Sequence, residues 1–281
     1  MEASIVDLIS FNNSKFYLKR DDLLSREFSG NKARKFYYYL QNDFPNIKKI
    51  ISHGSSQSNA MYSLSVLTKM RGWEFDYFVD HIPSYLKDNP HGNYFYALKN
   101  GMNIICGDLP KEFKSDELFI PEGGRVDKSE FGIKILAEEI NSFMQDQIFD
   151  IFLPSGTGTT ALFLQAHLNV KVYTTPCVGD ESYLKKQFLE LNSNIKEHPT
   201  ILNLDKKYHF GKLYREFFEI WIELKKQTNI EFDLLYDPKG WLTMLKHKDK
   251  LKNPILYIHQ GGLIGNESML KRYNRKFNEN Y

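Results

Sequence analysis

The chain has 281 residues, of which 26% are charged, and its formal net charge is +2. So balanced a charge gives no electrostatic attraction to nucleic acid or to a membrane surface, and we expect neither as a partner. The first ten residues lack the regions of a signal peptide, no run approaches the length of a membrane span, and the two cysteines lack the spacing of a metal site. We therefore expect a cytoplasmic protein that acts on a small molecule and binds no metal.

Seven short apolar runs are predicted to be strands, with helical patterns between most of them. In chain order they are residues 16–18, 49–52, 74–79, 103–106, 149–153, 171–175 and 254–259. This alternation predicts an α/β fold with parallel sheets, whose ligands bind at the carboxyl ends of the strands. Motifs that directly follow a strand are therefore the strongest candidates for a site.

The first candidate is Lys32, which follows a Gly30-Asn31 turn and opens a predicted helix. A lysine in this position is held on a short tether, so its amine can be aimed at one carbonyl group, as a Schiff-base lysine requires. The alternative is an ordinary surface lysine in a basic cluster with Arg34 and Lys35.

Gln57, Ser58 and Asn59 follow the strand 49–52 and precede an amphipathic stretch, so we place them at a helix N-terminus. Free backbone N–H groups at such an end suit a carboxylate. The alternative is a plain helix cap, for which serine and asparagine are favoured.

A loop rich in small residues lies between the strand 149–153 and the next helical run. It contains Ser155, Gly156, Thr157, Gly158 and Thr159, and this arrangement is typical of a phosphate cradle. A P-loop is excluded because no lysine follows the final glycine, and the G-x-G-x-x-G pattern of dinucleotide-binding domains is absent. A nucleotide-binding domain is therefore disfavoured, and a tight turn without a ligand is the remaining alternative.

Together the motifs K-R-D-D-L, G-N-K-A-R-K and Q-S-N, in this order and spacing, resemble one branch of the tryptophan synthase β superfamily. It is the branch of the 1-aminocyclopropane-1-carboxylate deaminases and D-cysteine desulfhydrases, which depend on pyridoxal 5'-phosphate (PLP). The stretches at 232–240 and 259–263 resemble the family more loosely. The resemblance implies a two-domain fold type II enzyme with the cofactor in the interdomain cleft. Residues 1–34 and 141–281 would form the large domain, and residues 35–140 a small domain inserted in it.

The resemblance also implies the roles of individual residues. Lys32 would carry PLP, and Lys32, Ser58 and Tyr236 would be catalytic. The substrate would contact Gln57, Ser58, Asn59 and Gln260. The cofactor would contact Asn59, the loop Ser155, Gly156, Thr157, Gly158 and Thr159, and Asp237, which would face the pyridine nitrogen.

The implied reaction is a deaminating elimination on a small amino acid, which releases an α-keto acid and ammonia, in an enzyme that we expect to be a homodimer. The leaving group stays open: it is a thiol, a hydroxyl or a ring carbon. Three positions depart from the family: Asp237 stands where deaminases have glutamate, Gln260 matches neither branch, and Phe210 replaces a tyrosine. The alternative function is therefore a PLP-binding or carrier protein without turnover.

Overall fold

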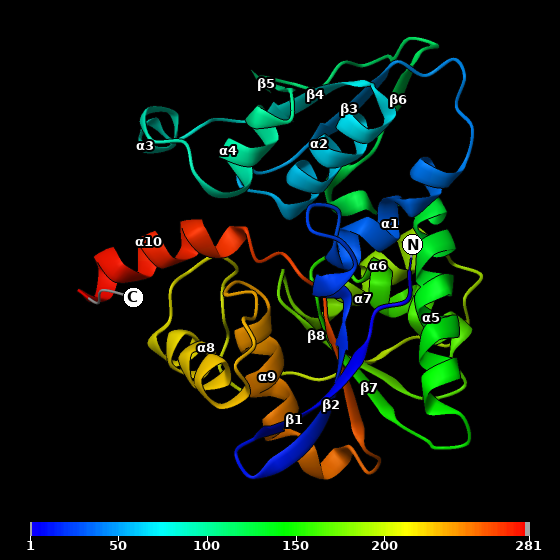
Figure 1. Ribbon diagram of the computed structural model, residues 1–281, viewed down its shortest axis with the longest axis vertical. Helices are drawn as coiled ribbons and strands as arrows, with labels where there is room; N and C mark the ends of the chain where they lie inside the picture. The colour runs from blue at the N-terminus through cyan, green and yellow to red at the C-terminus, as the bar shows by residue number, and fades with distance from the viewer. Residues whose placement is uncertain (1, 279–281) are drawn as a thin grey trace.

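The computed structural model describes residues 2–278 and contains two β-sheets flanked by helices (Figure 1). The strands are β1 (Val6–Phe11), β2 (Ser14–Arg20), β3 (Lys49–His53), β4 (Glu74–Val79), β5 (Met102–Cys106), β6 (Glu117–Phe119), β7 (Asp150–Ser155), β8 (Val172–Pro176), β9 (Thr200–Ile201) and β10 (Ile255–His259). The α-helices are α1 (Gly30–Gln41), α2 (Asn59–Arg71), α3 (Ser84–Asp88), α4 (Gly92–Lys99), α5 (Glu130–Met144), α6 (Thr159–His167), α7 (Glu181–Leu191), α8 (Arg215–Thr228), α9 (Asp237–Lys246) and α10 (Gly265–Phe277).

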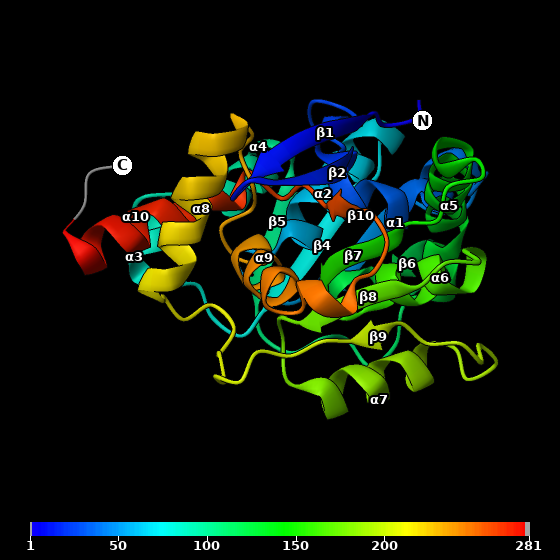
Figure 2. The same ribbon diagram turned by 90° about the horizontal axis from the view of Figure 1, so that it is seen from below.

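The larger sheet has six strands in the order β1-β2-β10-β7-β8-β9, and all its pairs except β1 with β2 are parallel. Side chains alternate between its two faces, as strand geometry requires. Phe152 and Tyr257 join the core beneath α8 and α9, whereas Ile151 and Ile258 join the core beneath α5 and α6. Figure 2 shows these two helix layers on opposite sides of the sheet. Both faces are thus covered, which explains why β7 and β10 are apolar and fully buried.

The smaller sheet has four parallel strands in the order β5-β4-β3-β6. Its core includes Ile50, Phe75 and Tyr77 from the strands, together with Leu64 and Leu67 from α2. The chain forms β1 and β2, builds this second sheet, and then returns to the first with β7 (Figure 1). The expected domain limits at 34/35 and 140/141 fall within α1 and α5, and the division of the chain stays a prediction.

The α/β architecture and all seven predicted strands are confirmed, since each predicted run overlaps an observed strand. Three strands were not predicted: β1, β6 and β9. β1 forms a hairpin with β2 through Asn12 and Asn13, which have φ angles of 48° and 58°. Asparagine tolerates this left-handed conformation, so the Asn-Asn pair was a readable turn signal. β6 and β9 are too short to show a period of two. Among the described residues, no helix combines the length and the apolar composition needed to cross a membrane.

Candidate active site

A cavity of about 330 Å³ opens where the carboxyl ends of the parallel strands meet. Its walls come from the segments that follow β3, β6, β7, β8 and β10, together with the start of α1. This is where open α/β sheets bind ligands, and the volume lies in the usual range for small-molecule sites. Every residue that the sequence suggested for the site lines this cavity: Lys32, Gln57, Ser58, Asn59, Ser155, Gly156, Thr157, Gly158, Thr159, Tyr236, Asp237 and Gln260.

The turn before Lys32 is fastened to the segment after β10. Gly30 has a φ angle of +68°, and a Cβ atom there would lie 2.1 Å from the Gln260 carbonyl oxygen, so only glycine fits. The Asn31 backbone N–H donates to that same oxygen at 2.9 Å, and the Asn31 side chain donates to Gln260 Oε1 at 3.0 Å. Gln260 Nε2 in turn donates to the Pro154 carbonyl oxygen at 2.6 Å. The side chain of Gln260 therefore links the lysine turn to the end of β7.

Lys32 projects from the first turn of α1 into the cavity. Burial lowers the pKa of its amine from 10.5 to about 8, although the carboxylates of Asp233 and Glu122 oppose this shift. A larger fraction of neutral amine is then present near neutral pH, and the neutral amine is the nucleophile.

The N-terminus of α2 is capped by a side chain and also forms part of the cavity wall. Ser58 Oγ accepts hydrogen bonds from the backbone N–H groups of Ala60 and Met61, so the plain cap does form. The Gln57 side chain donates to the His91 carbonyl oxygen at 3.2 Å, and Asn59 Oδ1 accepts from Asn93 at 2.6 Å. Gln57 and Asn59 line the cavity, and their side chains are oriented by these hydrogen bonds to residues around the smaller sheet.

The loop after β7 has a buried cation beside it. Lys35 lies one turn after Lys32 in α1 and donates to the Gly123 carbonyl oxygen at 3.0 Å and to Thr157 Oγ1 at 3.4 Å. Its side chain is buried, and no carboxylate of the described residues lies within ion-pair distance. Burial, with Lys32 nearby, holds the pKa of Lys35 well below its usual value. A buried ammonium without an anion is costly, so this corner of the cavity is suited to an anionic ligand.

The loop itself offers further donors to such an anion. α6 begins at Thr159, directly after Gly158 with a φ angle of +74°, and its first N–H groups face the loop. Thr160 Oγ1 is buried without a hydrogen-bond partner in the described part of the chain. The Ser155 hydroxyl, by contrast, is bonded to Thr174 on β8 at 2.7 Å, and its contact with the cofactor stays a prediction.

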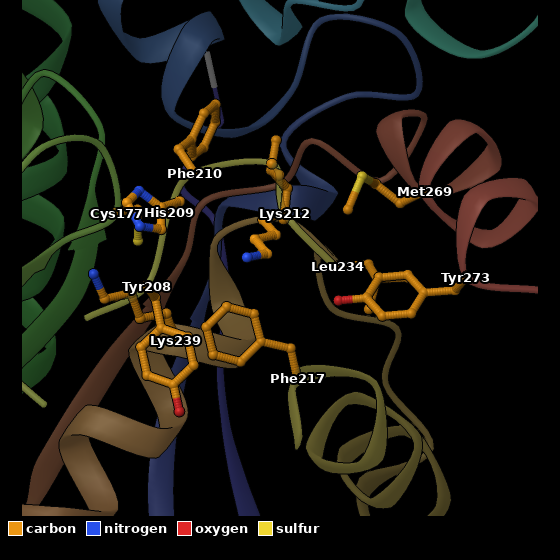
Figure 3. Close-up of a pocket in the computed structure, with 12 residues that line it drawn as sticks. Cys177, Tyr208, His209, Phe210, Lys212, Phe217, Leu234, Lys239, Met269 and Tyr273 are labelled. Carbon is orange, nitrogen blue, oxygen red and sulfur yellow. The ribbon is translucent and has the colours of Figure 1, made fainter. Parts of the chain in front are cut away.

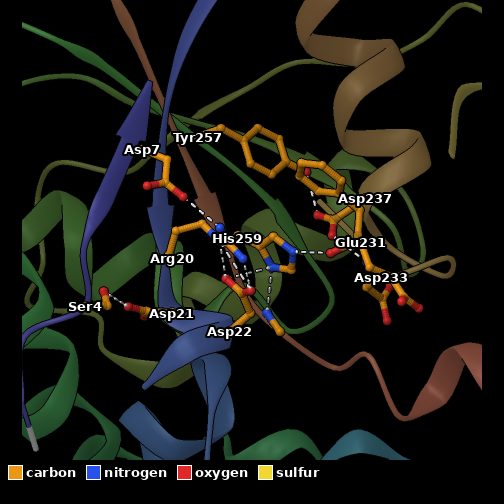
Figure 4. Close-up of polar contacts among 12 residues, drawn as sticks. Ser4, Asp7, Arg20, Asp21, Asp22, Glu231, Asp233, Asp237, Tyr257 and His259 are labelled. Atoms are coloured by element: carbon orange, nitrogen blue, oxygen red, sulfur yellow. Dashed lines mark hydrogen bonds and ion pairs between the residues drawn. The ribbon is translucent and has the colours of Figure 1, made fainter. Parts of the chain in front are cut away.

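Two buried carboxyl groups, those of Asp233 and Asp237 (Figure 4), also line the cavity. Asp237 Oδ1 accepts from the Tyr257 hydroxyl at 2.6 Å, and its Oδ2 accepts from the Asp233 backbone N–H at 2.9 Å. Burial, reinforced by the neighbouring Asp233, raises the pKa of Asp237 well above its usual value. Burial likewise raises the pKa of Asp233 to about 7. The arrangement favours a proton on this carboxyl pair, which a basic ligand atom could share.

Tyr236 lies between these carboxyl groups and the loop after β7, residues 155–159. We call this loop the phosphate-type loop. Burial raises the pKa of its phenol, so the phenol is protonated at neutral pH. The Phe210 ring packs against it at a centroid distance of 5.3 Å. Phe210 also lines a smaller neighbouring pocket together with Cys177 and Lys239 (Figure 3).

No family model matches the chain. A curated protein of Thermotoga maritima, named "Putative 1-aminocyclopropane-1-carboxylate deaminase", is 26% identical to it over 285 residues, with 89% of each chain covered. A solved structure described as an ACC deaminase homologue superposes with a TM-score of 0.78 and 21% identity, covering 98% of this chain and 93% of that one. A PLP-dependent aspartate racemase superposes with a TM-score of 0.64 and 13% identity, covering 92% and 90%.

The chain is thus similar, at 26% identity or less, to proteins named as putative aminocyclopropane-carboxylate deaminases and to a solved homologue of such a deaminase. It has the fold type II architecture that the resemblance implied. The lining residues fit the cofactor of that fold: Lys32 offers a nucleophilic amine, the loop and Lys35 suit a phosphate, and the carboxyl pair suits a ring nitrogen. The roles of the individual residues stay predictions.

The cavity also contains groups that were not expected in the site from the sequence. They are Lys35, Glu122, Asp233 and Tyr183. Glu122 follows β6, which has only three residues and was not among the predicted strands, so its place at a strand end was not recognised. Lys35 and Asp233 lie within the quoted motifs, but only the tertiary structure shows that their side chains reach the cavity.

Proposed function

We propose that the protein is a PLP-dependent enzyme that deaminates a small amino acid and releases an α-keto acid and ammonia. The observation that carries the proposal is Lys32, whose amine has its pKa lowered to about 8 in the cavity that also contains the phosphate-type loop. When bound, PLP would withdraw electrons from the substrate and so weaken the bonds at its α-carbon. The expected homodimer and cytoplasmic location remain predictions.

The chain's own residues would hold the two reactants as follows. Lys35 and the N–H groups at the start of α6 would bind the phosphate, and Asp237 would share its proton with the ring nitrogen. The α2 terminus at Ser58 and Asn59 would take the substrate carboxylate. Each of these groups is already oriented by bonds within the fold, so little reorganisation would accompany binding.

Proton transfers would then fall to two residues. Once Lys32 is free of the cofactor, its amine would act as the base at the α-carbon, since its lowered pKa leaves part of it unprotonated at neutral pH. Tyr236 is protonated and would donate to the departing group or to a substrate carbon. Phe210 has no proton to give, so we expect β-elimination to be faster than opening of a cyclopropane ring.

The test is spectroscopic and kinetic. Protein incubated with PLP should absorb in the visible, and borohydride reduction followed by peptide mapping should place the adduct on Lys32. D-Cysteine or β-chloroalanine should be converted to pyruvate with a higher kcat/KM than 1-aminocyclopropane-1-carboxylate is converted to 2-oxobutyrate. An adduct on another lysine contradicts the assignment of Lys32. PLP binding without turnover of any amino acid supports the alternative, a non-catalytic PLP-binding protein.

A further inference from the structure

Two of the charged side chains in the cavity form no hydrogen bond or ion pair with any residue that the structure describes. Five charged residues line the cavity: Lys32, Lys35, Glu122, Asp233 and Asp237. Lys35 donates to Thr157 and Gly123, and the oxygens of Asp233 and Asp237 accept hydrogen bonds from the chain around them. Lys32 and Glu122, by contrast, form no hydrogen bond or ion pair with any residue between 2 and 278. Under the proposed function Lys32 would be taken up by the cofactor, which leaves Glu122 as the charge without a partner.

Glu122 begins a 3-10 helix (Glu122–Gly124) just after β6, at the carboxyl end of the small sheet. A Cβ atom on Gly54, in the loop after β3, would lie 2.9 Å from Glu122 Oε1 and 2.7 Å from the Tyr77 hydroxyl. A Cβ atom on Gly123 would lie 3.1 Å from Thr157 Cγ2. The Glu122 carboxylate therefore lies beside the β3 loop, the next residue, Gly123, lies beside Thr157, and the Glu122 side chain remains exposed.

The negative charge of Glu122 affects the pKa values of other residues in the cavity. It opposes the lowering of the pKa of Lys32 and contributes to the raised pKa of Tyr236. The two anionic groups of the cofactor and the substrate would bind elsewhere in the cavity. The phosphate would lie beside Lys35, and the substrate carboxylate would lie at the α2 terminus. The part of the ligands that would remain to contact Glu122 is the side chain of the substrate. An unpaired carboxylate beside that side chain favours a positive charge on it and repels a negative one.

We propose that Glu122 selects amino acids with a short, positively charged side chain, of which 2,3-diaminopropionate is the simplest. This inference rests on the proposed function and names its substrate class. The side chain is short because the cavity of about 330 Å³ must also hold the cofactor. The ammonium group of the substrate would form a charge-assisted hydrogen bond to the Glu122 carboxylate.

The chemistry of this substrate balances without a further reagent. The Cα–H bond breaks and its proton goes to the Lys32 amine, while the Cβ–N bond breaks and the β-nitrogen leaves as ammonia. The three-carbon product then takes up one water molecule and loses the α-nitrogen as a second ammonia. One diaminopropionate and one water thus give one pyruvate and two ammonia, with no oxidant or reductant.

The test compares 2,3-diaminopropionate, as each enantiomer, with the matching enantiomer of β-chloroalanine, which has a neutral side chain. PLP-loaded wild-type protein should show a kcat/KM for one diaminopropionate enantiomer at least about tenfold above that for β-chloroalanine. Glu122→Gln should lose about tenfold or more on diaminopropionate, the size of one charge-assisted hydrogen bond, and little on β-chloroalanine. The visible spectrum of the variant should match that of the wild type.

The matched control is Asp127→Asn, which removes an exposed carboxylate five residues away that does not line the cavity. It should leave both rates unchanged. A wild type that prefers β-chloroalanine, or a Glu122→Gln variant that loses equally on both substrates, overturns the inference and leaves the proposed function standing. A PLP-loaded wild type that turns over neither compound, nor D-cysteine, overturns both.

Discussion

At the scale of single residues, the two lysines in the first turns of α1 differ in what surrounds them. Lys32 has carboxyl groups near enough to oppose its loss of charge, whereas Lys35 has none within ion-pair distance among residues 2–278. Their spacing of three places both side chains on one face of the helix. Under the proposed function, one amine would react with a carbonyl and the other would bind a phosphate.

The pH dependence of PLP attachment should report on Lys32. Only the neutral amine attacks a carbonyl, and the pKa of Lys32 is lowered to about 8, so the rate of attachment should rise from pH 7 to 9 with a midpoint near 8. The measurement is the rate at which the borohydride-stable adduct forms at each pH. A midpoint near 10.5 would indicate an ordinary solvent-exposed lysine.

Replacing Lys35 should have opposite effects on cofactor binding and on stability. In Lys35→Met the affinity for PLP should fall about 10- to 100-fold, because a charge-assisted hydrogen bond to the phosphate is lost. The Tm of the cofactor-free protein should rise, since a buried ammonium without a counterion is removed. Fluorescence titration and thermal unfolding measure the two. Lys134→Met, on the exposed face of α5, should change neither, and unchanged PLP affinity in Lys35→Met would place the phosphate elsewhere.

At the scale of elements, the loop between β7 and α6 uses its two glycines differently. A Cβ atom on Gly156 would make an ordinary contact, 3.4 Å from Tyr236 Cε1, on the wall of the cavity. On Gly158, whose φ angle is +74°, it would lie 2.4 Å from Phe188 Cε1 inside a small core. The first glycine leaves room for a ligand, and the second lets the loop turn into α6.

The pair Gly156→Ala and Gly158→Ala should therefore separate binding from folding. We expect Gly156→Ala to weaken PLP binding while changing the free energy of unfolding by less than about 0.5 kcal/mol, as is usual for a substitution that fits. Gly158→Ala should lower that free energy by roughly 1–3 kcal/mol through backbone strain and overlap. Urea unfolding and PLP titration of both variants measure this, and equal losses of stability would show that the loop responds as one unit.

How much of the fold and of the candidate site could be predicted from the sequence differs from element to element. The seven longer apolar runs identified the strands because a buried parallel strand is a nearly continuous apolar segment. β6, with three residues, carries no such signal, and with it the place of Glu122 at a strand end was missed. The glycine and hydroxyl content of the loop after β7 predicted its position, but the bond from Ser155 to Thr174 depends on the neighbouring strand.

At the scale of the whole molecule, a buried ion-pair cluster connects segments far apart in the chain. The fully buried Arg34 of α1 donates to Asp21 at 2.8 Å and to Glu139 of α5 at 2.6 Å, and Lys19 of β2 donates to Glu139 at 2.6 Å. The sequence places Arg34 in a basic cluster with Lys35 but does not show which carboxylates it contacts. Arg34→Met should lower the free energy of unfolding by roughly 3–5 kcal/mol, because it leaves the buried Asp21 carboxylate without its cation and Glu139 with Lys19 alone.

The same cluster should make stability fall in acid. Burial opposes ionisation of Glu139, but the bonds from Arg34 and Lys19 lower its pKa below the ordinary 4.5. A carboxyl with a lowered pKa in the folded state stabilises the fold above pH 4.5, and this contribution is lost as the pH falls through the lowered value. Urea unfolding at pH 7 and pH 4 should therefore show a smaller difference in Glu139→Gln than in the wild type. An equal difference would place the acid sensitivity in other carboxyl groups.

The link between Asn31 and Gln260 has a consequence for biosynthesis. The lysine turn is synthesised early, but Gln260, whose side chain holds it, is added 229 residues after Asn31. A nascent chain that stops before β10 therefore lacks the strand that completes the centre of the large sheet and the partner that orients Lys32. Capture of the cofactor should thus be a late event, and truncated chains released from stalled ribosomes should leave free PLP in the cell unbound.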